Sequence, residues 1–376
     1  MKILSYFDKW IKVYDYLALK KSDKVITFYS EGKNYWPYLK GILENILKEF
    51  DASIYYVTSD ADDPGLCKDN KNYNTLLIDE GFMRDWFFKK LNTHILITTM
   101  PDIDNFQIKK SINTDYYVYT QHSMMSPNCS YRKGSFDNYD IIFCCGQYMI
   151  DEIRKAEEFY NLPKKELVKH GYTRLDTLID EYKVFQKSKL NNTGEQRILL
   201  APSWNEGGII ESELTDKIIQ SSINEGFQIT LRPHPESLKK SPQKIKKILD
   251  KFSNNNFFRY EDNIVTNDNL YNSDLLITDW SGIALEYAFA LNKPILFVNT
   301  PQKILNDDYH VLGARAFEDM IRDKIGIIWN GKETITDVIK KFKNINYESA
   351  NYIFNIGKSN EVAALYIKDL VKKIIS

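Results

Sequence analysis

Two short stretches of the sequence combine residue types that bind phosphate, and the first is Arg232-Pro233-His234-Pro235. A residue before proline is held in an extended conformation, and side chains two positions apart on an extended segment point the same way. The pattern therefore predicts a guanidinium and an imidazole side by side on a stiff backbone, an arrangement that suits an anion. The alternative is a rigid turn with a solvated Arg232 and an incidental histidine.

The second stretch runs from Asp274 to Glu286, where an apolar strand leads into a turn of small residues and then a helix. The first backbone N–H groups of a helix lack internal partners and lie at the positive end of its dipole, so they attract phosphate. The candidate ligands here are Thr278, Asp279, Ser281 and Gly282. The alternative is that Asp279 or Ser281 only caps the helix. Glu286, one turn further on, is either a ligand of a ribose hydroxyl or a surface residue.

A histidine follows another apolar strand. His122 comes after the aromatic run 116–120 and before the irregular loop 123–134, the kind of segment that lines sites. An imidazole titrates near neutral pH and can accept the proton of a hydroxyl group. The alternative is a structural or solvated histidine. Gly171 and Arg174 lie at a further turn between elements and are also placed to reach a ligand.

The elements that must position these residues alternate between strand and helix, which predicts an α/β fold with parallel sheets. The alternation stops at the polar stretch 189–196 and then restarts. We therefore expect an N-terminal Rossmann-like domain over 1–190 and a C-terminal one over 191–376, facing a central cleft. In such sheets ligands bind at the carboxyl ends of the strands, where the candidate residues fall.

Residues 1–21 have apolar side chains at helical spacing, interspersed with lysines. We interpret this segment as an amphipathic helix that packs on the first domain. The alternative is a helix that lies in a membrane interface, with aromatic rings in the lipid and lysines at anionic headgroups.

Composition excludes several classes of protein. The net charge of −1 argues against a dedicated nucleic-acid binder, and the four cysteines form no C-x-x-C pair. The sequence has no signal peptide, no membrane-spanning run and no dinucleotide, Walker or zinc-protease motif. We expect a cytoplasmic protein, with peripheral contact at the inner face of the membrane if the N-terminal helix is interfacial, and we expect neither a cofactor nor a metal site.

Four motifs together resemble the CDP-glycerol glycerophosphotransferase family, the teichoic-acid-type polyol-phosphate transferases. They are Gly171-Tyr172-Thr173-Arg174-Leu175-Asp176, Ala201-Pro202-Ser203-Trp204, Arg232-Pro233-His234-Pro235 and the run 273–282. The resemblance covers roughly residues 115–300. It implies a GT-B fold and transfer of glycerol phosphate or ribitol phosphate from a CDP-linked donor to a hydroxyl of a glycan or lipid-linked acceptor, with release of CMP.

The same resemblance implies roles for single residues. His122 corresponds to the base that deprotonates the acceptor, and His234 with Arg232 to the groups that face the donor phosphates. Thr278, Ser281 and Gly282 correspond to ligands of the pyrophosphate, and Ser203 lies in a matching motif. The family usually has Trp-His-Gly-Thr where this chain has Gln121-His122-Ser123, and Asp-Tyr-Ser-Ser where it has Asp279-Trp280-Ser281-Gly282.

These departures indicate a divergent branch, one that serves capsule or lipopolysaccharide rather than wall teichoic acid. Two other functions stay open from the sequence. One is a GT-B glycosyltransferase that uses a nucleotide sugar, and the other is a non-catalytic scaffold of a polysaccharide-assembly complex. The polyol, the acceptor and the length of the product are not fixed by any motif.

Overall fold

The computed structural model describes residues 2–49, 51, 53–67, 70–105, 108–188, 196–262, 266–313, 315–342 and 347–376. Most of the expected linker, 189–195, lies outside the described residues. The chain forms two compact units. The first comprises Met1–Thr177, Leu305–Ala314 and Ala350–Ser376, and the second comprises Leu178–Ile304 and Arg315–Ser349. The chain thus passes between the units at several points, where the sequence analysis expected a single boundary near residue 190.

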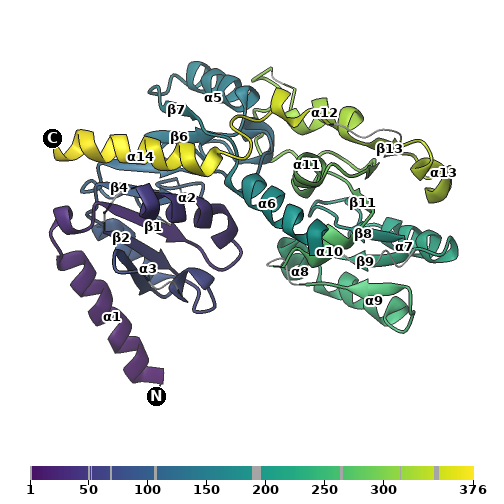
Figure 1. Ribbon diagram of the computed structural model, residues 1–376, viewed down its shortest axis with the longest axis horizontal. Helices are drawn as coiled ribbons and strands as arrows, with labels where there is room; N and C mark the ends of the chain where they lie inside the picture. The colour runs from purple at the N-terminus through teal and green to yellow at the C-terminus, as the bar shows by residue number, and fades with distance from the viewer. Residues whose placement is uncertain are drawn as a thin grey trace. The chain divides into compact units, whose positions relative to one another are not determined.

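The first unit is built on a parallel sheet (Figure 1). Over the described residues its seven strands have the order β3-β2-β1-β4-β5-β6-β7, with every neighbouring pair parallel. The strands are β1 (Ile26–Ser30), β2 (Ile54–Thr58), β3 (Tyr73–Leu77), β4 (Ile95–Thr98), β5 (Tyr116–Tyr119), β6 (Ile141–Cys144) and β7 (Glu166–Lys169). Its helices are α1 (Lys2–Ala18), α2 (Trp36–Glu49), α3 (Phe82–Lys90), α4 (Pro127–Ser130), α5 (Gln147–Phe159) and α14 (Ser359–Ile375). Helix α6 (Thr173–Ser188) contains the boundary after residue 177.

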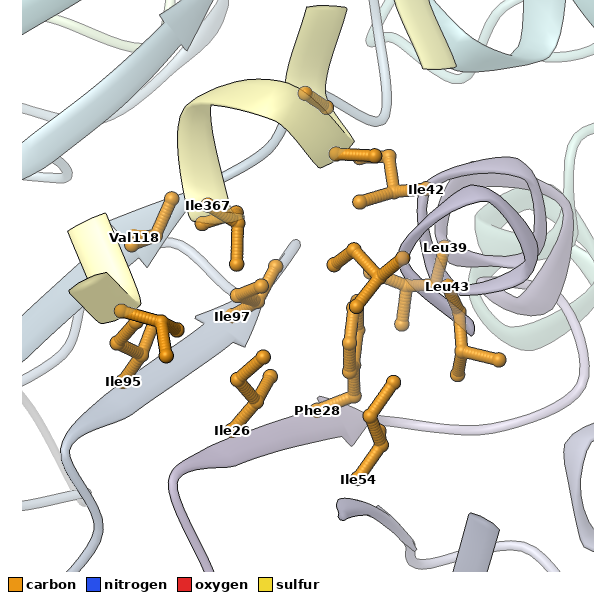
Figure 2. Close-up of a cluster of buried hydrophobic side chains, with 14 of the residues drawn as sticks. Ile26, Phe28, Leu39, Ile42, Leu43, Ile54, Ile95, Ile97, Val118 and Ile367 are labelled. Atoms are coloured by element: carbon orange, nitrogen blue, oxygen red, sulfur yellow. The ribbon is translucent and has the colours of Figure 1, made fainter. Parts of the chain in front are cut away.

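One face of this sheet is covered by α2 and α14 (Figure 2). Phe28 and Ile97 from the strands meet Leu39 from α2 and Ile367 from α14 in one buried cluster. The central strands β1, β4 and β6 are buried along their whole length because helices cover both faces, as is usual for parallel sheets. Gly41 lets the two helices come close, since a Cβ there would lie 2.3 Å from the side chain of Asn360.

The motif 171–176 joins α14 to this unit. Gly171 has φ of +103°, and a Cβ at this position would lie 2.3 Å from the carbonyl oxygen of Phe354. The carboxylate of Asp176 accepts hydrogen bonds from the N–H of Gly357 (2.7 Å) and of Asn360 (3.3 Å) at the start of α14. The motif therefore attaches the C-terminal helix, which the sequence analysis assigned to the second domain. Its apolar face was visible in the sequence, but the sheet that it covers was not.

The second unit repeats the plan with a second parallel sheet (Figure 1). In the described part of the chain its six strands have the order β10-β9-β8-β11-β12-β13. They are β8 (Arg197–Leu200), β9 (Gln228–Leu231), β10 (Phe258–Tyr260), β11 (Leu275–Thr278), β12 (Ile295–Val298) and β13 (Ile327–Trp329). Its helices are α7 (Leu214–Asn224), α8 (Pro235–Lys240), α9 (Pro242–Phe252), α10 (Asp268–Asn272), α11 (Ile283–Glu286), α12 (Phe317–Ile325) and α13 (Ile335–Ile339).

In each sheet the first three strands are added toward one edge, and the later strands are added toward the other edge. The strand order therefore reverses between β1 and β4 in the first sheet and between β8 and β11 in the second. This is the strand order of Rossmann-like folds, and the reversal is where such sheets bind ligands. The expectation of two Rossmann-like units with parallel sheets is therefore confirmed. A π-helical turn, Tyr287–Leu291, follows α11 and ends at Asn292 in the left-handed conformation.

Helix α1 packs on the first unit through one face only. Val13 and Tyr16 are buried, whereas Phe7, Ile11 and Tyr14 are 60%, 58% and 67% exposed. The buried ammonium of Lys24 holds the end of the helix, since it donates to the carbonyl oxygens of Tyr16 (2.5 Å) and Leu17 (3.1 Å). Packing is therefore confirmed for one face, and the other face stays open to solvent. The helices described here include none with the length and apolar character needed to span a membrane.

We predict that Lys24→Met loosens α1 from the first unit. The variant leaves the last carbonyl groups of the helix without their charged donor, and a hydrogen bond to a charged group contributes about 1.5–3 kcal/mol. The free energy of unfolding in urea should fall by about that amount, and proteolysis near residue 20 should accelerate. The exposed Lys20→Met is the matched control, and equal stability of the two variants would contradict the role given to Lys24.

Candidate functional site

The predicted residues lie at the carboxyl ends of strands, as the fold requires. His122 follows β5 in the first unit, and Arg174 lies at the start of α6. The others belong to the second unit and follow β8, β9 or β11, or lie in α11: Ser203, Arg232, His234, Thr278, Asp279, Ser281, Gly282 and Glu286.

The ring of His122 is oriented by the backbone. Its Nδ1 lies 3.0 Å from the carbonyl oxygen of Thr99 and 3.1 Å from the hydroxyl of Tyr119. A carbonyl oxygen can only accept, so Nδ1 carries the hydrogen in this contact. The neutral ring therefore has Nε2 as its unprotonated nitrogen, and Nε2 is the atom available to accept a proton.

Four tyrosines surround this histidine, and the sequence analysis did not single out any of them. Their ring centroids lie 5.6–6.4 Å from that of His122, each in an edge-to-face arrangement, and they are Tyr35, Tyr38, Tyr119 and Tyr131. Burial among these rings lowers the pKa of His122 from 6.5 to about 4. The imidazole is consequently neutral at physiological pH. With 25 tyrosines in the chain, their number alone could not identify these four.

Polar groups with unused hydrogen-bonding capacity lie next to His122 in the fold. The side chain of Gln121 is buried, and among the described residues neither its amide oxygen nor its nitrogen has a partner. The same holds for the hydroxyls of Thr99 and Thr120, which directly follow the paired strand ends Thr98 of β4 and Tyr119 of β5. Buried polar groups are usually paired, so such a group indicates water or a ligand.

Arg174 is buried in the first unit, with its guanidinium carbon 5.6 Å from the ring centroid of Tyr38. It therefore packs on one of the tyrosines that surround His122. Its neighbours Gly171 and Asp176 have the structural role in attaching α14 described above. The motif 171–176 thus attaches α14 to the first unit, and it also places the cation Arg174 against Tyr38, which in turn contacts His122.

In the second unit, His234 has the extended backbone predicted for a residue before proline, with φ of −63° and ψ of 143°. Its Nδ1 accepts a hydrogen bond from the N–H of Glu236 at 3.1 Å. The hydrogen of the neutral ring must then be on Nε2, so this nitrogen is a donor. Arg232 is buried, with Nε 3.8 Å from Oε2 of Glu261, which excludes the solvated arginine of the alternative interpretation.

Asp279 connects loops rather than capping the following helix. Its carboxylate accepts from the N–H of Ser203 (2.7 Å) and from the hydroxyl of Thr300 (3.3 Å), and the hydroxyl of Thr278 donates to the carbonyl of Ala201 at 2.7 Å. Helix α11 begins without a side-chain cap. Neither Asp279 nor Ser281 therefore caps this helix. The N–H groups of Ala284 and Leu285 donate to the carbonyl oxygens of Ser281 and Gly282, each at 3.1 Å, so the groups that remain for an anion are the N–H groups that precede them in the turn.

The remaining predicted residues of this unit surround the same turn. Ser281 and Gly282 are half-buried and open the turn of α11, and Glu286 is buried, which excludes the surface alternative. The hydroxyl of Ser203 is buried and has no partner in the described ranges. The same part of the chain contains no cluster of three His, Cys, Asp or Glu side chains that could hold a metal ion.

A buried arginine that the sequence analysis missed packs against this turn. The guanidinium carbon of Arg322 lies 3.9 Å from the ring centroid of Trp280, and its Nη2 donates to the carbonyl oxygen of Val298 at 3.2 Å. Burial lowers the pKa of Arg322, and the charge of Asp279 opposes this effect. Arg322 lies 43 residues after Asp279 in the sequence, outside every motif, so no local pattern indicated it.

Comparison with known proteins identifies a family that matches most of the chain. The family described as CDP-Glycerol:Poly(glycerophosphate) glycerophosphotransferase matches residues 13–352. The teichoic acid glycerol-phosphate primase of Bacillus subtilis (strain 168) is 24% identical over 171 residues, which are 45% of this chain and 42% of that protein. The chain thus matches less than half the length of this relative.

Solved structures show the same fold. The wall teichoic acid polymerase TagF superposes with a TM-score of 0.61 at 18% identity, over 99% of each chain. The UDP-GlcNAc 2-epimerase of Methanocaldococcus jannaschii, solved with UDP-GlcNAc and UDP, has a TM-score of 0.56 at 14% identity, over 92% of this chain and 99% of that one. At these identities the likeness shows the GT-B-like fold alone, as the sequence analysis expected.

A second buried histidine in the first unit generates a prediction about pH. His170 stacks on Phe143 with ring centroids 4.8 Å apart, and burial lowers its pKa from 6.5 to about 4. Between these pH values the unfolded chain binds a proton that the folded protein excludes, so the free energy of unfolding falls as the pH falls. We predict that His170→Leu removes up to about 1.4 kcal/mol per pH unit of this dependence. Urea titrations from pH 7 to 4 measure it.

The exposed His310→Leu is the control for this experiment. Parallel pH profiles for wild type and His170→Leu would contradict the exclusion of the proton from the buried ring.

Proposed function

Because the chain belongs to the CDP-glycerol:poly(glycerophosphate) glycerophosphotransferase family, we propose that it transfers a polyol phosphate to a glycan or glycolipid. The donor is CDP-glycerol or CDP-ribitol, the nucleophile is a hydroxyl of the acceptor, and CMP is released. The product belongs to a cell-surface polymer such as a capsule, a lipopolysaccharide or a teichoic-acid-like chain. The primase from B. subtilis and TagF carry teichoic acid in their names, which supports this assignment.

The observation that carries the proposal is the complementary state of the two histidines. His122 has its hydrogen on Nδ1, held by a backbone carbonyl, and presents Nε2 as a base. His234 has the opposite tautomer, since its Nδ1 accepts from a backbone N–H, and it presents Nε2–H as a donor. A phosphoryl transfer to a hydroxyl group needs one of each: a base for the nucleophile and a donor for the phosphate oxygens.

The proposed step follows from these states. The acceptor oxygen attacks the phosphorus that bears the polyol, and its proton passes to Nε2 of His122. The bond between this phosphorus and the bridging oxygen breaks, and CMP leaves with the electron pair. His234, through Nε2–H, and Arg232 stabilise the charge on the phosphates. Preorganised donors of this kind supply most of the rate enhancement in many enzymes.

The other residues of the second unit are assigned to the donor. The pyrophosphate is bound by Ser281, Gly282 and the uncapped start of α11. Ser203, whose N–H is bonded to Asp279 of the same turn, adds a buried hydroxyl. Asp279 and Thr278 support the turn from within rather than contacting phosphate. Glu286 is assigned to a ribose hydroxyl.

The acceptor is assigned to the first unit. Gln121, Thr99 and Thr120 have buried hydrogen-bonding groups without partners among the described residues, next to His122. Family members usually have a tryptophan where this chain has Gln121. An amide suits a polyhydroxylated acceptor, which favours a glycan here.

We predict that His122→Ala and His234→Ala each lower kcat for release of CMP from CDP-glycerol by about 10²–10⁴-fold, the usual contribution of a positioned acid or base. Because the pKa of His122 is lowered to about 4, the acid limb of kcat/KM should lie well below pH 6.5. Stopped assays of CMP release between pH 4.5 and 8 measure both effects.

His310→Ala is the matched control, since this histidine is exposed and lies in no motif. Near-normal turnover in both site variants would refute the assignment of the histidines. Consumption of a nucleotide sugar, with CDP-glycerol and CDP-ribitol ignored, would move the chain to the glycosyltransferases. Absence of any turnover with intact nucleotide binding would favour the scaffold.

We also propose that the exposed face of α1 contacts the membrane that carries a lipid-linked acceptor. Phe7, Ile11 and Tyr14 project from it, and Phe82 at the start of α3 is 74% exposed and touches Trp10 of the helix, with ring centroids 6.1 Å apart. Apolar side chains of this kind insert at the headgroup boundary.

We predict that the triple variant Phe7→Ser, Ile11→Ser, Tyr14→Ser loses flotation with vesicles that contain anionic lipid, whereas wild type floats. Val184→Ser on α6 is the control, because Val184 is as exposed as Tyr14 but lies on another helix. Equal flotation of wild type and the triple variant would exclude this contact.

A further inference from the structure

Two lysines of the second unit converge on one tryptophan that none of the assignments above uses. Nζ of Lys240 lies 3.7 Å from the ring centroid of Trp204, and Nζ of Lys303 lies 3.4 Å from it. Trp204 follows β8, Lys240 is the last residue of α8, and Lys303 follows β12. These three residues, called the Trp204 platform below, are brought together by the tertiary fold alone.

The segments that carry the platform are fastened to one another. The side chain of Asn205 donates to the carbonyl of Pro301 at 2.9 Å, which ties the loop of Trp204 to that of Lys303. The carboxylate of Asp279 connects the same two loops through Ser203 and Thr300. The platform is therefore held at the carboxyl ends of the strands before any ligand binds.

The platform adjoins His234. The imidazole and the ring of Trp204 have centroids 6.3 Å apart, and the same imidazole caps α8, the helix that ends at Lys240. Lys240 also lies 3.4 Å from the carboxylate of Glu236, which it shares with Lys239. One carboxylate thus faces two ammonium groups of α8, and Lys303 adds a third from another loop.

Two ammonium groups that share one aromatic ring repel each other, and a cation–π contact at an exposed site returns only about 0.5–1 kcal/mol. An anion bound beside the ring reduces this repulsion, and each ammonium group has three N–H donors to offer to its oxygens. The position beside His234, which faces phosphate in the proposed function, indicates that this anion is a phosphate.

We propose that Lys240 and Lys303, held against Trp204, form a phosphate-binding subsite next to His234. The inference rests on the proposed function and deepens it, because it adds a subsite beyond the turn 278–282. The phosphate belongs either to the donor pyrophosphate or to a phosphodiester of the acceptor chain, and the two sources call for separate binding measurements.

The test uses the double variant Lys240→Met, Lys303→Met, with Lys239→Met as the matched control. Lys239 is the neighbour of Lys240 on α8 and has the same ion-pair partner, but it makes no contact with Trp204 among the described residues. Calorimetry measures the Kd of inorganic pyrophosphate, CDP, cytidine and a synthetic glycerol phosphate trimer. The double replacement Lys240→Arg, Lys303→Arg keeps the charge and should restore binding.

We expect the Met variant to bind at least one phosphate ligand about tenfold more weakly, with a shallower dependence on salt and no change for cytidine. Weaker binding of pyrophosphate and CDP assigns the subsite to the donor, and weaker binding of the trimer alone assigns it to the acceptor. Unchanged binding of all phosphate ligands, or an equal loss in Lys239→Met, would overturn the subsite.

Failure of the proposed function gives a different pattern. If wild type does not release CMP from CDP-glycerol but the Met variant still weakens pyrophosphate binding, the function is wrong and the subsite stands. If wild type turns over normally and the Met variant binds every ligand as wild type does, only the subsite is wrong.

Discussion

Three loops leave neighbouring strands of the second unit, and the buried carboxylate of Asp279 fastens them to one another through Ser203 and Thr300. A buried charge is costly unless it is paired, and here a backbone N–H and a hydroxyl donate hydrogen bonds to the carboxylate. The positive charge of Arg322 also interacts electrostatically with Asp279. Arg322 in turn stacks on Trp280, the residue after Asp279. Trp204, Ser281 and Lys303 lie in the loops that this carboxylate joins, so the loops assigned to the donor in the proposed reaction depend on Asp279.

Both units also use a backbone group to orient a histidine ring. A carbonyl oxygen orients His122, whereas an N–H orients His234, and these opposite partners give the two rings opposite tautomers. The tyrosines around His122 keep its pKa low and so keep the ring neutral. A base of this kind does not lose its function when the pH falls slightly, in contrast to an exposed imidazole with a pKa near 6.5.

Much of the architecture was predictable because parallel strands covered on both faces are continuous apolar runs, as in Ile295–Val298. The edge strands β3, β7, β10 and β13 are harder to predict, because the first three are interrupted by polar residues and β13 is only three residues long. β7 has exposed Glu166 and Lys169 at its two ends. The positions of His122 and His234 were predictable from strand ends and prolines. Their tautomers were not, because these depend on Thr99 and Glu236 through the folded backbone. Arg322, Tyr35 and Tyr38 were not predictable either, because they lie far from the motifs in the sequence.

The most direct test of the account is a calorimetric comparison of CMP, CDP, UDP, GDP, CDP-glycerol and CDP-ribitol binding to wild type and Ser281→Ala. Ser281 opens the uncapped turn of α11, so the account predicts selective binding of cytidine diphosphates that weakens in the variant. Selective binding of UDP or GDP, or cytidine binding that Ser281→Ala leaves unchanged, would contradict it.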